Sequence, residues 1–151
     1  MPKILDFMNK EHDELDELCL LFLEAVEKGE PVNQQAKALS DFKENLLLHM
    51  KLENEYLFPR LSASLGMEKD SAIAEQARND HGGLIKLLGL METAFQENNR
   101  EGTLYHGKNL ARALKTHHAR EDEIQYPVSD RFISEEEWQG ILKSVYGDNV
   151  Q

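Results

Sequence analysis

Apolar residues recur along this chain at alternating steps of three and four, the spacing of one face of an α-helix. Four long stretches follow this rule, over about residues 3–28, 33–59, 70–97 and 103–128. Their stripes are Ile4, Met8, Leu15, Cys19, Phe22 and Val26; Leu39, Phe42, Leu46, Tyr56 and Leu57; Ala74, Ala77, Leu84, Leu88, Met91 and Phe95; and Leu110, Leu114, Ile124 and Val128. The pattern predicts four amphipathic helices.

Glycine, proline and capping residues predict where these helices begin and end. Gly29 and Pro31 end the first, and Pro59 either kinks the second or begins its end. The third stops at the loop 98–102, after which Thr103 is expected to cap the fourth. A short fifth helix is predicted from Ser134, which forms a capping-box pattern with Glu137 ahead of Trp138, Ile141 and Val145.

Amphipathic helices joined by short loops pack side by side around one central seam. We therefore expect an all-α fold, an up-down-up-down four-helix bundle with a short C-terminal fifth helix. The 151 residues match the usual size of one domain, so residues 1–151 are expected to form a single domain with its core bundle at about residues 3–132.

Composition narrows the range of partners. The formal net charge of -11 argues against a nucleic-acid partner, which would need a basic face. The longest apolar run, residues 18–23, is too short to span a bilayer, and the N-terminal residues lack the apolar core of a secretory signal. We expect a cytoplasmic protein without a membrane partner. Cys19 has no second cysteine to pair with, so packing or a metal must hold the fold.

The two halves of the chain contain an internal repeat of polar residues. His12, His49, Glu53 and Pro59 recur as His81, His117, Glu121 and Pro127. The separations are 68 or 69 residues (81 − 12 = 69 and 117 − 49 = 68, for example). Two helical hairpins related in this way would bring equivalent residues to facing positions around a pseudo-twofold axis.

The four histidines and two glutamates of the repeat fill gaps in the apolar stripes, so we expect all six side chains to point into the bundle. Burying them bare would be costly, because an unpaired buried ion costs several kcal/mol. His49 and Glu53 lie one helical turn apart, as do His117 and Glu121, so one helix can offer both nitrogen and oxygen to metal ions. The mixed shell suits iron, manganese or zinc, and the alternative is a buried hydrogen-bonded network.

These motifs resemble the hemerythrin-like, or HHE cation-binding, proteins. The stretch 49–59, HMKLENEYLFP, is the most specific part, and the resemblance extends over about residues 8–130. It implies a four-helix bundle that holds two non-haem iron ions. In the family pattern His12 and His49 would serve one iron, His81 and His117 the other, and Glu53 and Glu121 would bridge the two.

The sequence departs from the oxygen-carrying hemerythrins in two places. Those proteins have a second histidine one turn before the third-helix histidine, where this chain has Ala77, and an aspartate five residues after the fourth-helix histidine, where Glu121 follows His117 by four. One nitrogen ligand is therefore missing, and one iron is expected to keep an open position. This pattern is similar to the bacterial repair-of-iron-centres proteins, linked to nitric oxide stress, and to the iron-sensing domain of a ubiquitin-ligase subunit.

Other residues have weaker signals. His106 and His118 fall off the stripes, and for His118 we expect a surface or outer position, not a ligand. Tyr56, near the seam, either packs or donates a hydrogen bond to a bound diatomic molecule, and Cys19 is expected to be a small buried hydrophobe. The expected walls of an apolar ligand pocket are Leu84, Leu46, Leu114 and Phe42.

The resemblance implies a non-haem di-iron protein that binds oxygen or nitric oxide at the open position for sensing, scavenging or storage. A di-iron enzyme that reduces nitric oxide or peroxide is the main alternative. A protein that delivers iron for the repair of iron centres, or a purely structural bundle, is the third.

Overall fold

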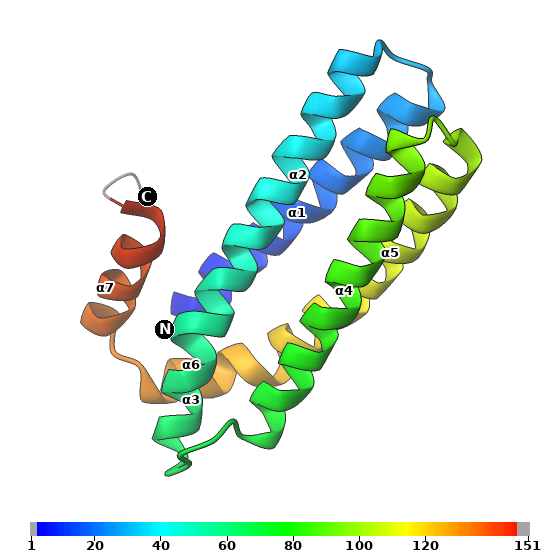
Figure 1. Ribbon diagram of the computed structural model, residues 1–151. Helices are drawn as coiled ribbons and strands as arrows, with labels where there is room; N and C mark the ends of the chain where they lie inside the picture. Colours follow the sequence, from blue (N-terminus) through cyan, green and yellow to red (C-terminus); the bar gives the residue numbers. More distant parts are fainter. Residues whose placement is uncertain (1–2, 148–151) are drawn as a thin grey trace.

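The computed structural model describes residues 3–147, and nearly all of them are helical (Figure 1). The elements are α1 (Lys3–Glu27), α2 (Val32–Leu52), the π-helical turn η1 (Glu53–Leu57), α3 (Phe58–Ser64), α4 (Ala72–Gln96), α5 (Arg100–Arg120), the π-helical turn η2 (Glu121–Gln125), α6 (Tyr126–Phe132) and α7 (Glu135–Tyr146). Two of the long helices thus run through a π turn into a short continuation, α2 into α3 and α5 into α6.

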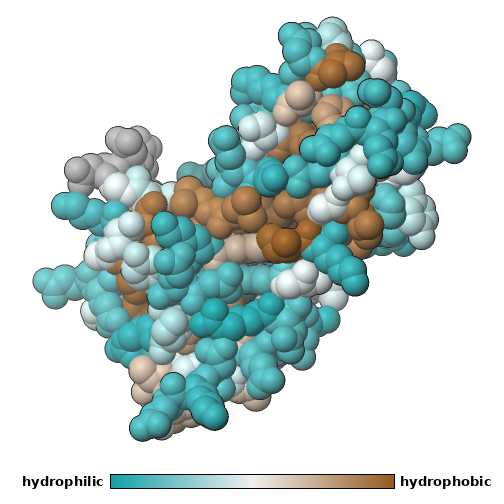
Figure 2. Space-filling view, viewed as in Figure 1, coloured by the Kyte–Doolittle hydropathy of each residue, from teal (hydrophilic) through white to brown (hydrophobic). Residues whose placement is uncertain are grey.

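The long helices pack as the predicted up-down-up-down bundle. Helix α1 lies against α2 and α5, and α4 lies against α5 (Figure 1). On the face shown in Figure 2, hydrophobic residues gather where α2 and α4 face each other. The partly exposed Leu47 of α2 and Ile85 of α4 line one pocket. In the described part of the chain, none of the helices has the length and hydropathy that a bilayer span requires. The predicted fold class is confirmed.

The predicted apolar stripes form the core with few exceptions. One large cluster fills the upper bundle of Figure 1 with Leu15, Cys19, Phe22, Val26, Leu39, Phe42, Leu46, Leu84, Leu88, Met91, Leu110 and Leu114, among others. A second cluster at the other end joins Ile4 and Met8 of α1 to α7. Cys19 is 1% exposed, as expected for a small buried hydrophobe.

The two π turns explain where the stripes fail. In each, an amide N–H reaches back five residues, from Phe58 to the Glu53 carbonyl and from Tyr126 to the Glu121 carbonyl. A π turn takes in an extra residue, which rotates everything after it relative to the expected register. Gln125 is therefore buried and Ile124 is 51% exposed, so the prediction of Ile124 as a core residue was wrong.

The same turns settle the role of the two repeated prolines. Pro59 and Pro127 lie in the first turn of α3 and α6, and the chain stays helical up to them and beyond them. A proline there has no N–H to continue the helical hydrogen bonds, and the wider π turn before it relieves the clash of its ring. Pro59 neither ends the second helix nor stands alone as a kink.

The start of the fourth helix differs from the prediction. Helix α5 begins at Arg100, because the Asn99 side chain accepts a hydrogen bond from the Gly102 N–H at 2.9 Å. Asn98 turns the chain there with a φ of 59°. Thr103 lies inside the helix and donates to the Asn99 carbonyl at 2.7 Å, so the prediction of Thr103 as the cap was wrong.

The predicted fifth helix is present as α7. The Ser134 hydroxyl accepts from the Glu137 N–H at 3.1 Å, which confirms the cap, while the Glu137 carboxylate pairs with Arg60 at 2.5 Å. Trp138 and Leu142 are 1% and 2% exposed and pack in the cluster that contains Ile4. Helix α7 therefore covers one side of the bundle, beside α1 and α2 (Figure 1).

Candidate metal centre

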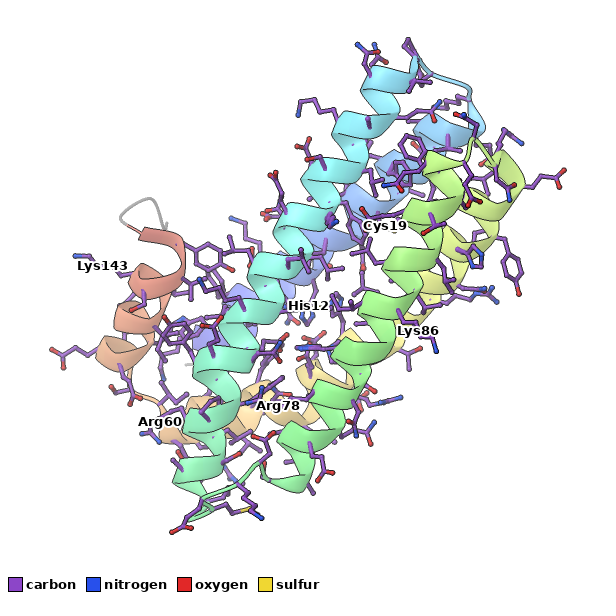
Figure 3. The ribbon with its side chains drawn as sticks, viewed as in Figure 1. His12, Cys19, Arg60, Arg78, Lys86 and Lys143 are labelled. Carbon is purple, nitrogen blue, oxygen red and sulfur yellow. The ribbon has the colours of Figure 1, made fainter. Side chains whose placement is uncertain are left out.

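The structure brings together all six residues of the repeat in the interior of the bundle. Their exposed fractions are 3% for His12, 1% for His49, 0% for Glu53, 4% for His81, 4% for His117 and 2% for Glu121. Each comes from a different element, in the order α1, α2, η1, α4, α5 and η2. Figure 3 shows His12 directed from α1 into the space between the helices, whereas Lys143 points outward.

The histidines form two pairs, and each carboxylate lies between the pairs. The ring centroids are 5.0 Å apart for His12 and His49, and 4.9 Å for His81 and His117. The Oε1 atom of Glu53 lies 3.3 Å from Nε2 of both His49 and His81. The Oε1 atom of Glu121 lies 3.4 Å from Nε2 of His12 and 3.2 Å from Nε2 of His117. Each carboxylate thus contacts one histidine of each pair.

Several polar atoms at the centre lack hydrogen bonds. Among residues 3–147, buried atoms without a hydrogen-bond partner include Nε2 of His49, His81 and His117, Oε1 of Glu53 and Oε2 of Glu121. Such orphaned groups are rare in protein interiors because each loses its hydration without replacement. Imidazole nitrogens and carboxylate oxygens that face one another are also the donors that divalent iron, manganese and zinc accept. The residues present fit a metal.

The electrostatics indicate the same need for positive charge. Burial raises the pKa of both carboxyls, but His49 holds the pKa of Glu53 well below its usual value. Burial and the negative charge of Glu53 raise the pKa of Glu121 well above its usual value. Burial lowers the pKa of His49, yet Glu53 and Glu11 together raise it to about 10. Without a metal ion, the pair of carboxyls is therefore stabilised by a proton on Glu121 and by the positive charge of His49.

Each histidine presents its other ring nitrogen to an acceptor. His81 Nδ1 donates to Asn54 Oδ1 at 2.9 Å, and His117 Nδ1 donates to Asp80 Oδ2 at 3.0 Å. The remaining two face carboxylates, with His12 Nδ1 at 3.2 Å from Asp122 Oδ1 and His49 Nδ1 at 3.6 Å from Glu11 Oε1. Partners of this kind fix the tautomer and orientation of metal-binding histidines.

These orienting partners also follow the repeat. Glu11 precedes His12 as Asp80 precedes His81, and Asn54 and Asp122 follow Glu53 and Glu121. Sequence reasoning did not identify them, although the separations of 69 and 68 residues (80 − 11 and 122 − 54) were available as a signal.

His118 lies in the interior beside His12 and not at the surface. It is 4% exposed, and its ring stacks parallel on that of His12, with centroids 3.6 Å apart. One of its ring nitrogens belongs to a group with His12, His49 and Glu121 whose ligating atoms lie within 4.8 Å of one another. Of the two positions expected for His118, the structure excludes the surface one, because α1 packs closely on α5 and covers the residue beside His117. Burial and the charges of His12 and His49 lower the pKa of His118, which favours its neutral form.

Tyr126 is a further functional candidate that sequence reasoning missed. Its buried hydroxyl lies 2.9 Å from His12 Nε2, 2.9 Å from Glu53 Oε2 and 3.0 Å from Glu121 Oε1. The repeat places Phe58 at the equivalent position, beside His81 with ring centroids 5.4 Å apart. The two halves of the centre therefore differ by one phenolic hydroxyl.

The other residues singled out from the sequence lie elsewhere. Tyr56 and His106 are half-buried, and His106 belongs to neither group of potential ligands in residues 3–147. The expected pocket walls Leu84, Leu46, Leu114 and Phe42 are packed in the large core cluster.

The potential ligands form two overlapping groups that share Glu121. The second group consists of Glu53, His81, His117 and Glu121, and all of its residues are buried. The family described as the hemerythrin HHE cation binding domain matches residues 3–128. The chain belongs to this family. The match includes both halves of the repeat, and the family together with these groups supports a metal-binding role for this HHE domain. No curated protein and no solved structure matches the chain significantly.

Proposed function

We propose that this HHE domain holds two iron ions and binds a diatomic molecule, oxygen or nitric oxide, at one of them. The proposed ligands are His12 and His49 for one ion, His81 and His117 for the other, and Glu53 and Glu121 as bridges. Manganese and zinc would also fit these donors.

The position of the carboxylates carries this proposal. Glu53 Oε1 is equally close to His49 and His81, which belong to different pairs. Glu121 Oε1 is likewise shared between His12 and His117. A carboxylate placed between two imidazole pairs is arranged to bridge two ions, because a single ion would draw both pairs to one point.

The protein's own residues leave one side of the centre incomplete. Ala77 stands one turn before His81, where it offers no ligand. An iron pair, when bound, supplies an open coordination position and up to two electrons. The surrounding side chains orient the ligands, exclude bulk water and hold a proton at Tyr126. These properties suit sensing, scavenging or storage of a diatomic molecule.

Tyr126 favours the enzymatic alternative, reduction of nitric oxide or peroxide. These reductions consume protons, and the Tyr126 hydroxyl holds one within 3.0 Å of both carboxylates. Burial and the charges of Glu121 and Glu53 raise the pKa of Tyr126 well above its usual value, so the proton is retained in the metal-free chain. Turnover would also need an external electron donor.

Anaerobic loading with ferrous iron tests the proposal. The iron content and the Mössbauer spectrum should report two high-spin ferrous ions per chain. Oxygen or nitric oxide is then added, and the optical spectrum is followed. A stable, reversible adduct supports a binding protein, and steady consumption with a released product supports the enzyme. Failure to take up iron would refute both.

Ligand variants test the residue assignments. Glu53→Ala and His117→Ala should each lower bound iron well below two ions per chain, because each removes one of the six buried donors of the proposed ligand set. His106→Ala is the matched control, since it removes a histidine that lies outside both ligand groups. Two ions retained by either ligand variant would contradict the assignment.

A further inference from the structure

A cavity of about 250 Å³ adjoins the second group of ligands. It lies between α4, α5 and η2, and both His117 and Glu121 form part of its wall. Much of the remaining wall is apolar, from Ile73, Ala77 and Ile124. The cavity therefore lies next to the side of the centre where Ala77 offers no ligand.

The repeat explains why this side is open. The cavity residues Ile73, Ala77 and Gln125 correspond to Ile4, Met8 and Leu57 of the first half (73 − 4 = 69, 77 − 8 = 69 and 125 − 57 = 68). The first-half residues are all buried in the cluster that contains Trp138 and Leu142 of α7. Helix α7 thus covers the equivalent face of the first half. In the described part of the chain, no comparable helix lies over the second half.

Gln125 is a buried polar residue in the wall of this cavity. It is 2% exposed and lines the cavity, and its Nε2 has no hydrogen-bond partner among residues 3–147. An amide donor left unpaired in the interior is costly, since it has lost its hydration. In the first half the equivalent residue is the apolar Leu57, so packing of this position does not demand an amide. The unpaired N–H indicates a ligand that accepts a hydrogen bond.

We propose that this cavity is the ligand pocket of the centre, with Gln125 Nε2 as the donor to the bound molecule. It would take a small, uncharged and mainly apolar molecule that carries a hydrogen-bond acceptor. Anions are disfavoured, because Glu121 and Asp80 both lie in the wall and Arg120 at the rim is already paired with Asp80 at 2.8 Å. This assignment rests on the proposed function. Oxygen and nitric oxide belong to this chemical class, and the volume exceeds that of one water, about 30 Å³, several-fold.

The repeat supplies the variants for a test. Ala77→Met introduces the residue found at the equivalent position of the first half, Met8, and fills the cavity. Gln125→Leu introduces the equivalent of Leu57 and removes the proposed donor. Glu75→Met is the control, because it adds the same side chain to an exposed position of α4. Binding of nitric oxide to the ferrous-loaded proteins is measured by stopped flow, and iron content is measured in parallel.

The two variants should differ in the step they affect. Ala77→Met should slow association by at least about tenfold, because the route to the centre is filled. Gln125→Leu should keep the association rate and raise the dissociation rate by about tenfold, the equivalent of one net hydrogen bond. Glu75→Met should match the wild type in both rates, and all variants should bind two ions.

Xenon provides a readout that needs no metal. Crystals of the metal-free protein under xenon pressure should show the gas in this cavity in the wild type and in Glu75→Met, but not in Ala77→Met. If the iron-loaded wild type binds neither oxygen nor nitric oxide, the proposed function fails and the pocket assignment falls with it. If it binds nitric oxide and both cavity variants match its rates, only the pocket assignment is overturned.

Discussion

Replacing Tyr126 with phenylalanine removes one hydroxyl and leaves the packing of the ring unchanged. That hydroxyl lies within 2.9 to 3.0 Å of His12, Glu53 and Glu121, all buried. A hydrogen bond to a charged group contributes roughly 1.5–3 kcal/mol. Since the hydroxyl has a single proton but several partners, we expect Tyr126→Phe to lower the free energy of unfolding of the metal-free protein by about 2–3 kcal/mol. For a chain of this size, the midpoint of thermal unfolding should fall by about 4–12 °C.

Metal ions should reduce this loss. Bound cations satisfy the carboxylate oxygens, so the hydroxyl is no longer their main source of compensation. With zinc, which has no redox chemistry, we expect the effect of Tyr126→Phe to fall to about 1 kcal/mol or less. Thermal unfolding is followed by circular dichroism in the metal-free and zinc-loaded proteins.

Tyr105→Phe is the matched control, because it removes a hydroxyl from a residue that is 64% exposed. It should leave the unfolding midpoint unchanged in both states. If Tyr126→Phe and Tyr105→Phe unfold at the same temperature without metal, the Tyr126 contacts contribute nothing to stability. If Tyr126→Phe lowers the free energy of unfolding equally with and without zinc, bound cations do not replace the hydroxyl as partners of the carboxylates.

Three further predictions concern Asp80 beside the centre, Cys19 in the large core cluster and Trp138 of α7. Asp80→Asn should weaken metal binding about 10- to 100-fold in a chelator competition, because Asp80 orients His117, and a value equal to the wild type would refute that role. Burial raises the pKa of Cys19 from 9.0 to about 12, so iodoacetamide at about pH 8 should leave the folded protein unmodified by mass spectrometry but label it fully in guanidinium. Trp138→Ala should lower the free energy of unfolding by about 3–5 kcal/mol in urea, and a loss below about 1 kcal/mol would show that α7 is only loosely docked.

The sequence by itself determined the four long helices and the six buried residues at their centre. Helical periodicity is a local property, so a stripe of apolar residues specifies which face of each helix turns inward. His12 and His81 could be placed in the interior because each fills a gap in such a stripe, and the repeat related one half of the centre to the other. These conclusions need only the geometry of a regular helix.

Only the tertiary structure decided what breaks that regularity. Each residue of an α-helix advances about 100° around the axis, so the extra residue of a π turn moves Tyr126 and Gln125 inward and Ile124 outward. The burial of His118 depends on how closely α1 approaches α5, and the open cavity depends on α7 docking on one half alone. Contacts between segments far apart in the chain set these features, and the periodicity of a single helix does not encode them.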